Sequence, residues 1–401
     1  MSAPEPAPIS IGAPDGDKLL TPAFALLLCA QFSFGLAYST FFLLPKFLTQ
    51  ELHAHADTIG AVASASMIAA VLATPWMGAW LDRGARRPFI TYGAIVNGLS
   101  GCAFALIHSA SWPIYALRVV NGISYVLVFN AIVTLAADLS PPKRLGQAIG
   151  LCGAASIASN AFAPWVSEQI AEQHGWSLVF LLGGMMALFT SVLSLGLREP
   201  PHVTSALTVE HAAGPSALEL LCEPSRRGAF VCAAANGAAF GVMFTFTQPL
   251  ALSLGAKQVS ALFVGYTVCA LVVRLGLGTL SDTWGRRRIA FAALVLYGLV
   301  AFMTAFLRPG FLFAAGAGLG LAHAFLYPAL NALAAEGVPH ARRGAVMSYF
   351  YGSFLAGFAV WVLVLGVLAK SHGYPLAFLL TGALVWLSLP FLPRQALGAA
   401  L

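Results

Sequence analysis

Long apolar stretches alternate with short polar breaks along the whole chain. A hydrocarbon core of about 30 Å is crossed by about 20 apolar helical residues, so each stretch predicts one membrane-spanning helix. We expect twelve such helices, at residues 22–45, 59–81, 88–108, 112–137, 145–170, 176–197, 227–251, 259–281, 288–307, 311–335, 344–369 and 374–393. The pattern therefore predicts an all-α polytopic membrane protein.

A longer polar segment, 198–226, separates the sixth predicted helix from the seventh and contains Pro200, Pro201 and Pro215. We interpret it as a cytoplasmic linker between an N-terminal six-helix bundle, 22–197, and a C-terminal one, 227–393. Residues 1–21 and 394–401 are expected to be cytoplasmic tails. The first of these tails lacks the basic start and apolar centre of a signal peptide, so the first helix should insert and remain.

Composition agrees with this interpretation and excludes several kinds of site. Apolar residues make up 59% of the chain and charged residues 9%, and the mean hydropathy is +0.82, which is far above the range of a soluble domain. The six cysteines stand singly, without the spacing of a zinc site or a disulfide framework. We expect no metal and no cofactor.

Basic residues are distributed unequally between the predicted loops. Only four of the 21 Lys and Arg residues fall in loops on the side away from the termini, namely Lys46, Lys257, Arg308 and Lys370. By the positive-inside rule both termini are expected in the cytoplasm of a bacterial cell, with the chain in the inner membrane. Anionic lipid and topology account for the net charge of +6, so no nucleic-acid partner is required. The expected partner is the lipid bilayer, and we expect a monomer.

Two loop motifs occur in both halves at a nearly fixed offset, the sign of an internal duplication. A Gly-x-x-x-Asp motif followed by paired arginines comes after the second helix and again after the eighth. An acid, a proline, an arginine and a glycine in identical register follow the fourth helix and the tenth. The residues of these motifs that we consider gating candidates are Gly78, Asp82, Arg86, Arg87, Gly278, Asp282, Arg286 and Arg287 for the first, and Asp138, Arg144, Glu336 and Arg342 for the second.

These paired motifs resemble the major facilitator superfamily across essentially the whole chain. The resemblance implies two six-helix bundles related by a pseudo-two-fold axis, a central cavity that binds substrate near the midplane, and alternating access by rocking of the halves. It also implies that the first motif is a latch on the cytoplasmic side. Topology anchoring is the alternative for that motif, and helix capping for the second. Ala85 stands where the family usually has glycine, whereas Gly285 keeps the pattern.

No Asp or Glu lies deep in a predicted span, although two arginines do. A buried arginine stays charged and is normally paired with carbonyls, a carboxylate or an anionic ligand. Arg118 begins an Arg-x-x-x-Gly pattern that resembles a cavity-lining signature of the family, and its repeat equivalent is Gly316. Arg274 is predicted to share a helix face with Gly278 and Asp282. Substrate binding and purely local contacts remain open for both arginines.

Other candidate substrate or coupling residues are polar groups within predicted helices. His323 is the only mid-span histidine, and its ordinary pKa near 6.5 allows it to carry a proton. A neutral hydrogen-bonding role is the alternative. The remaining candidates, which either bind substrate or bond neighbouring helices, are Asn121, Gln31, Tyr38, Asn236 and Gln248.

The sequence thus predicts a secondary active transporter and not an enzyme. The leading hypothesis is proton-linked export of a small organic compound by alternating access, favoured by the Gly- and Pro-containing fifth helix, with protons as the coupling ion. The alternative is uptake or exchange of an organic anion such as a monocarboxylate, favoured by Arg118 and Arg274. A membrane sensor or enzyme is more remote, because the chain offers no paired nucleophile and base and no appended soluble domain.

Overall fold

The computed structural model describes residues 19–197, 199, 224–277, 280–338 and 340–393. Within these ranges, the side chains of residues 78–79, 81–83, 142, 224–225, 281–282 and 340–342 lie outside the description. Every regular element of the described part is helical, which confirms the predicted fold class.

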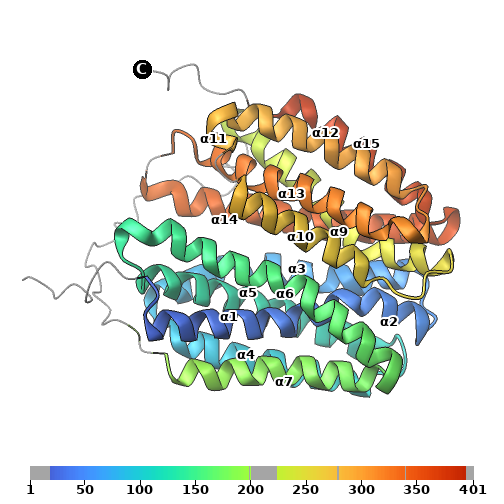
Figure 1. Ribbon diagram of the computed structural model, residues 1–401, viewed down its shortest axis with the longest axis horizontal. Helices are drawn as coiled ribbons and strands as arrows, with labels where there is room; N and C mark the ends of the chain where they lie inside the picture. Colours follow the sequence, from blue (N-terminus) through green and yellow to red (C-terminus); the bar gives the residue numbers. More distant parts are fainter. Residues whose placement is uncertain (1–18, 198, 200–223, 278–279, 339, 394–401) are drawn as a thin grey trace, which may run out of the picture.

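The helices fall into two sets along the chain, on either side of the undescribed residues 200–223 (Figure 1). The N-terminal set is α1 (Pro22–Thr40), α2 (Leu44–Gln50), α3 (Ala56–Arg83), α4 (Arg86–Ala103), α5 (Trp112–Asp138), α6 (Leu145–His174) and α7 (Trp176–Leu195). The C-terminal set is α9 (Pro224–Ser253), α10 (Ser260–Gly276), α11 (Leu280–Trp284), α12 (Arg286–Thr304), α13 (Leu312–Ala335), α14 (His340–His372) and α15 (Tyr374–Leu387). Most of the predicted linker and both tails lie outside the described residues.

Eleven spans of the described chain are long and apolar enough to cross a membrane, and the shorter α10 occupies the place of the twelfth. Two predicted single helices are interrupted. The helix expected at 22–45 ends at Thr40 and resumes at Leu44, because Pro45 has no N–H to continue the hydrogen-bond ladder. The helix expected at 259–281 ends at Gly276, where glycine lowers helix stability, and α11 begins at Leu280.

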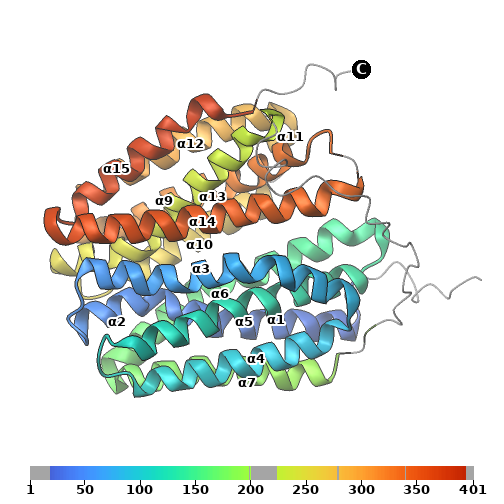
Figure 2. The same cartoon turned by 180° about the vertical axis from the view of Figure 1, so that it is seen from behind.

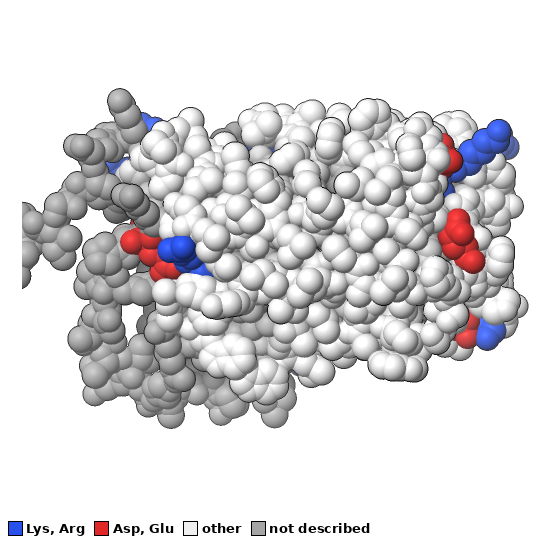
Figure 3. Space-filling view, turned by 90° about the horizontal axis from the view of Figure 1, so that it is seen from below, with Lys and Arg blue, Asp and Glu red and all other residues white. Residues whose placement is uncertain are grey.

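The two sets form two bundles that lie side by side (Figures 1 and 2). The described chain begins and ends at one end of the bundles, here called the terminal end. The turns that follow α2, α6, α9 and α14 lie at the other end, here called the far end. Charged side chains gather at these two ends, and the surface between them is almost free of charge on the face that Figure 3 shows. This is the distribution that a hydrocarbon layer around the middle of the molecule requires.

Close contact between the bundles near the far end depends on small residues of α3 and α14. A Cβ atom added to Gly60 would lie 2.7 Å from the carbonyl oxygen of Val362 and 3.2 Å from Cα of Gly366. One turn further along α3, the hydroxyl of Ser64 donates to the carbonyl of Ala359 at 2.8 Å. The two backbones approach this closely because glycine has no side chain to separate them.

Candidate functional site

A cavity of about 920 Å³ lies between the two halves. Its wall is built by α1, α3, α5 and α6 of the N-terminal half and by α9, α10, α13 and α14 of the C-terminal half, and most of the lining is apolar or aromatic. No Asp or Glu is among the described residues that line it. Four of the predicted substrate or coupling residues do line it, namely Tyr38, Arg118, Arg274 and His323.

Arg118 is the charged group of the N-terminal wall. It is 6% exposed; its Nε donates to the carbonyl of Val62 at 3.4 Å and its Nη2 to the hydroxyl of Ser66. Its guanidinium carbon lies 5.7 Å from the ring centre of Phe41. The second terminal nitrogen, Nη1, is buried without a hydrogen-bond partner among the described atoms. The guanidinium is therefore held in place by α3, while the N–H groups of Nη1 are left unpaired among the described atoms.

The Arg-x-x-x-Gly pattern has a direct structural explanation. A Cβ atom at Gly122 would lie 2.0 Å from the carbonyl oxygen of Ser66, so only glycine lets α5 cross α3 at this distance. Arg118 precedes Gly122 by one helical turn and shares its face. The close crossing thereby brings the guanidinium within reach of Ser66 and the carbonyl of Val62.

Aromatic rings cover much of the cavity wall on both sides. In the N-terminal half Tyr38 stacks on Tyr125 with ring centres 3.7 Å apart. In the C-terminal half Phe240 stacks on Phe244 at 4.2 Å and lies 4.8 Å from the ring of His323. The wall offers flat apolar surfaces of the size that aromatic ligands require.

His323 lines the cavity, and Asn236 of α9 holds its ring by a hydrogen bond. Its Nδ1 lies 3.2 Å from Oδ1 of Asn236, a contact in which the ring donates if the neutral tautomer carries its proton there. The rings of Tyr266, Tyr297, Tyr327 and Phe354 surround it at centre distances of 5.6 to 6.4 Å. Among the described lining residues it is the only imidazole.

Arg274 lies at the contact between the halves. A Cβ atom at Gly153 of α6 would lie 2.3 Å from an Nη atom of Arg274, so the guanidinium rests on the backbone of the opposite half. The same side chain lines a second hollow of about 520 Å³ beside Leu19 and Arg144. The predicted continuous face from Arg274 to Gly278 and Asp282 is wrong, because α10 ends at Gly276.

Four other polar candidates lie behind the cavity wall and bond protein groups. Gln31 donates to the hydroxyl of Ser156, Asn121 donates to the hydroxyl of Ser100 at 2.5 Å, and Asn236 holds His323. Gln248 donates at 2.7 Å to the carbonyl of Phe42 in the other half. In this structure the four side chains therefore hydrogen-bond neighbouring helices, which is the alternative to substrate binding.

The far end of the cavity is closed by contacts between the halves. The ring of Phe42 lies 5.2 Å from that of Phe244 and 5.8 Å from that of Phe263, measured between ring centres. Gln248 bonds the Phe42 carbonyl at the same level. These contacts join the two halves at the far-end side of the cavity.

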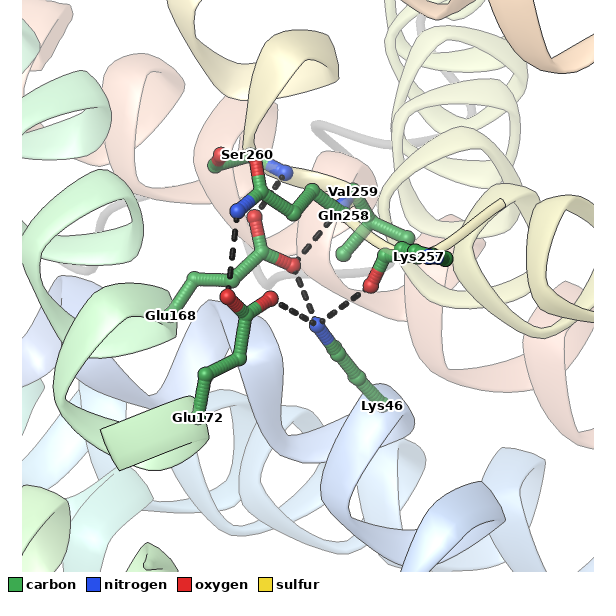
Figure 4. A network of polar contacts seen from close by, with 7 residues as sticks. All are labelled: Lys46, Glu168, Glu172, Lys257, Gln258, Val259 and Ser260. Carbon is green, nitrogen blue, oxygen red and sulfur yellow. Dashed lines mark hydrogen bonds and ion pairs between the residues drawn. The ribbon is translucent and has the colours of Figure 1, made fainter. Parts of the chain in front are cut away.

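Beyond the rings lies a buried polar network that sequence reasoning missed (Figure 4). Lys46 of α2 and Glu168 of α6, 2% and 0% exposed, form an ion pair with Nζ and Oε1 2.5 Å apart. Glu168 also accepts the backbone N–H groups of Val259 at 2.7 Å and Ser260 at 2.9 Å, and Lys46 donates to the carbonyl of Lys257 at 3.0 Å. The available signal was Glu168 itself, an acid near the end of an apolar helix.

The gating candidates at the terminal end are described only in part. Asp138 of the second motif pairs with Arg86 of the first: its Oδ2 lies 3.4 Å from Nε of Arg86, which stands at the start of α4 and meets the end of α5. Arg144 follows at the start of the next helix, α6. Among the other gating candidates, the backbone N–H of Arg87 donates to Glu199. Arg286 and Arg287 are the first two residues of α12, and Glu336 directly follows α13. The side chains of Gly78, Asp82, Gly278, Asp282 and Arg342 lie outside the described residues.

The two loops that carry the first motif differ in their backbone. Gly285 has φ of +89°, a conformation that favours glycine. Ala85, at the equivalent position of the N-terminal half, has φ of −62°. The departure from the family pattern at Ala85 is therefore matched by a different turn.

The sequence profile of the Major Facilitator Superfamily matches residues 26–257 and 229–396, which together span nearly the whole chain. The chain belongs to this superfamily. It is a membrane transporter and not an enzyme, as predicted.

Curated relatives of this superfamily member include the multi-drug resistance efflux pump PmrA of Streptococcus pneumoniae, 24% identical over 83% of this chain and 84% of the relative. Another is an uncharacterized MFS-type transporter of Mycobacterium tuberculosis, 29% identical over 82% and 81%.

Solved structures of superfamily members share the fold at low identity. A mutant of the nucleoside transporter NupG superposes with a TM-score of 0.80 at 14% identity, covering 92% of this chain and 98% of that one. The human organic anion transporter MFSD10 gives 0.68 at 18% identity, covering 93% and 100%. These likenesses show the fold alone.

Proposed function

We propose that this transporter exports a small organic compound with an apolar, aromatic body and a negatively charged group, in exchange for protons. The observation that carries the proposal is Arg118: a buried guanidinium, whose Nη1 has no partner among the described atoms, belongs to the wall of an aromatic cavity whose described lining contains no carboxylate. A buried charge without a counter-ion is unfavourable, so an anionic ligand gains the interaction that the protein leaves unmade.

Export is favoured by the relative that is named a multi-drug resistance efflux pump. We place the terminal end in the cytoplasm, because the basic residues of the predicted loops gather there. Because Phe42 and the polar network join the halves at the far end, we interpret this conformation as the state that receives the compound from the cytoplasm. His323 is the proposed proton carrier, since it is the imidazole of the cavity lining.

Uptake or exchange of an organic anion is the second candidate. It is favoured by the presence of two guanidiniums, Arg118 and Arg274, in one cavity. It shares the ligand chemistry of the first candidate and differs from it in direction.

Matched probes test the ligand class. Naphthoate, naphthalenemethanol and naphthylmethylammonium share one aromatic body and differ in charge, so the thermal stability of the purified protein should rise most with naphthoate. A ligand at a hundred times its dissociation constant stabilises by about 2.7 kcal/mol. Stabilisation by the ammonium compound alone would contradict the proposal.

Vesicles separate the two directions. An exporter that exchanges protons accumulates labelled naphthoate in inside-out vesicles with an acidic lumen. A proton-linked importer accumulates it in right-side-out vesicles when the outside is acidic. Accumulation only in the second preparation would replace export by uptake.

A further inference from the structure

We propose that Glu168 is a gate residue of the transport cycle, which closes the far end by capping the first turn of α10 in the opposite half, and that Lys46 positions its carboxylate. This role does not depend on which compound is carried. The carboxylate accepts the N–H groups of Val259 and Ser260, the cap residue and first residue of α10. These donors have no partner inside their own helix, and the helix dipole favours a negative charge there.

The ion pair alone does not join the halves. Lys46 belongs to α2 and Glu168 to α6, both in the N-terminal half. The bonds by which these two residues reach the C-terminal half are the two that Glu168 accepts and the one that Lys46 donates to the carbonyl of Lys257. Gln258 adds an exposed bond to Glu172 at 3.1 Å. Separation of the halves at the far end must break these three bonds.

Burial distinguishes this contact from a second ion pair that the described residues form across the far end. Lys370 and Asp57 also bridge the halves, with Nζ and Oδ2 2.7 Å apart, but their side chains are 50% and 30% exposed. Water screens and replaces such a pair at little cost. Glu168 has no such access while the far end is closed, so removal of one of its partners leaves buried groups unpaired.

The two buried residues have different roles. Glu168 touches the opposite helix, so it is the group whose loss should open the gate. Lys46 lies 2.5 Å from Glu168 and neutralises it, while Glu172 lies further from the lysine at 3.9 Å. Lys46 therefore holds the carboxylate in register with the two N–H groups.

The experiment uses cysteine reporters in the full-length transporter in membranes, after replacement of its six native cysteines. Both reporter positions line the cavity. Leu48→Cys lies in α2 and reports the far end, and Val133→Cys lies in the last turns of α5 and reports the terminal end. In Glu168→Gln, a membrane-impermeant maleimide applied at the far end should label Leu48→Cys at least about tenfold faster, equivalent to about 1.4 kcal/mol. Labelling of Val133→Cys from the terminal end should slow down. Equal rates in both forms would overturn the proposal.

Three variants sharpen the result. Glu168→Asp keeps the charge but shortens the arm by one methylene, so it should open the far end partially and tests the proposal even if Glu168→Gln does not fold. The exchange Lys46→Glu with Glu168→Lys restores an ion pair but sets an ammonium against two N–H donors, so the gate should stay open. If the exchange restores slow labelling, the cap is refuted. Asp57→Asn, which removes the exposed bridge, is the matched control and should change labelling by less than about threefold.

Discussion

The two halves of the transporter use the same helix crossing for different chemistry. Gly122 of α5 meets the carbonyl of Ser66 in the N-terminal half, and Gly320 of α13 meets the carbonyl of Tyr266 in the C-terminal half. One turn earlier, Arg118 donates to the carbonyl of Val62, whereas Gly316 lies against the carbonyl of Leu262.

The internal repeat therefore sets the geometry of the crossing and not its side chains. Where the N-terminal half carries a guanidinium and a serine, the C-terminal half carries a glycine and the phenol of Tyr266, which lines the cavity near His323. We infer that the duplicated frame allows one wall to hold the charged part of a ligand and the other to cover its apolar part.

The largest effect should come from breaking the shared crossing. Gly122→Ala and Gly320→Ala each place a methyl group 2.0 to 2.2 Å from a carbonyl oxygen, so the helices must separate, which should lower stability by about 3 kcal/mol or more. Thermal unfolding of the purified variants measures this, with Gly146→Ala, where a Cβ meets nothing within 4 Å, as the control. Normal stability in either variant would show that the crossing is looser than described.

Removal of the charge from the N-terminal wall should have the next largest effect. Arg118→Ala should weaken naphthoate binding roughly a hundredfold, about 3 kcal/mol, because a buried charge loses its partner. Naphthalenemethanol should bind as before. Arg118→Lys should fall between, since an ammonium lacks the fork that reaches Ser66, Val62 and a ligand together. Titrations by thermal shift decide this, and equal loss for both probes would reduce Arg118 to a structural role.

A substitution in the C-terminal wall should weaken the binding of charged and neutral probes equally. Phe240→Ala removes the ring that stacks on Phe244 and contacts His323, and should weaken naphthoate and naphthalenemethanol alike, by about tenfold. Phe306→Ala, at a side chain 76% exposed away from the cavity lining, is the control. A loss confined to naphthoate would contradict the division between the walls.

The smallest effect on binding, and the clearest on coupling, is expected at His323. His323→Gln keeps a hydrogen-bonding group beside Asn236 but cannot carry a proton. Naphthoate should bind within about threefold of the original protein and exchange across vesicles, yet a pH gradient should no longer drive its accumulation. Gradient-driven accumulation in the variant would move the coupling site away from this histidine.

Much of this arrangement was predictable from sequence. Apolar length gave the helices, and the paired loop motifs gave the family, because both depend on local composition. Arg118 and His323 were found because a charge or an imidazole in an apolar span is rare.

Other features depend on tertiary neighbours. Gln31 and Gln248 carry the same polarity as cavity residues but face helices, and spacing along one helix does not identify its neighbour. The aromatic wall of the cavity could not be predicted from the sequence, because aromatic residues also occur on the outer surface of the spans, as Trp76 does at 61% exposure. Glu168 was missed because its partners lie 122 and 91 residues away along the chain.

The contact of Gly60 with Gly366 affects the rate at which the two halves can move relative to one another. Side chains that interlock must withdraw from one another before two helices can tilt, and that withdrawal raises an activation barrier even when both end states are equally stable. Two glycines facing each other present nearly smooth backbone, so α3 and α14 can pivot near the far end with little friction. A bulkier residue at this point would therefore alter the turnover number of the transporter while leaving its affinity for the compound unchanged.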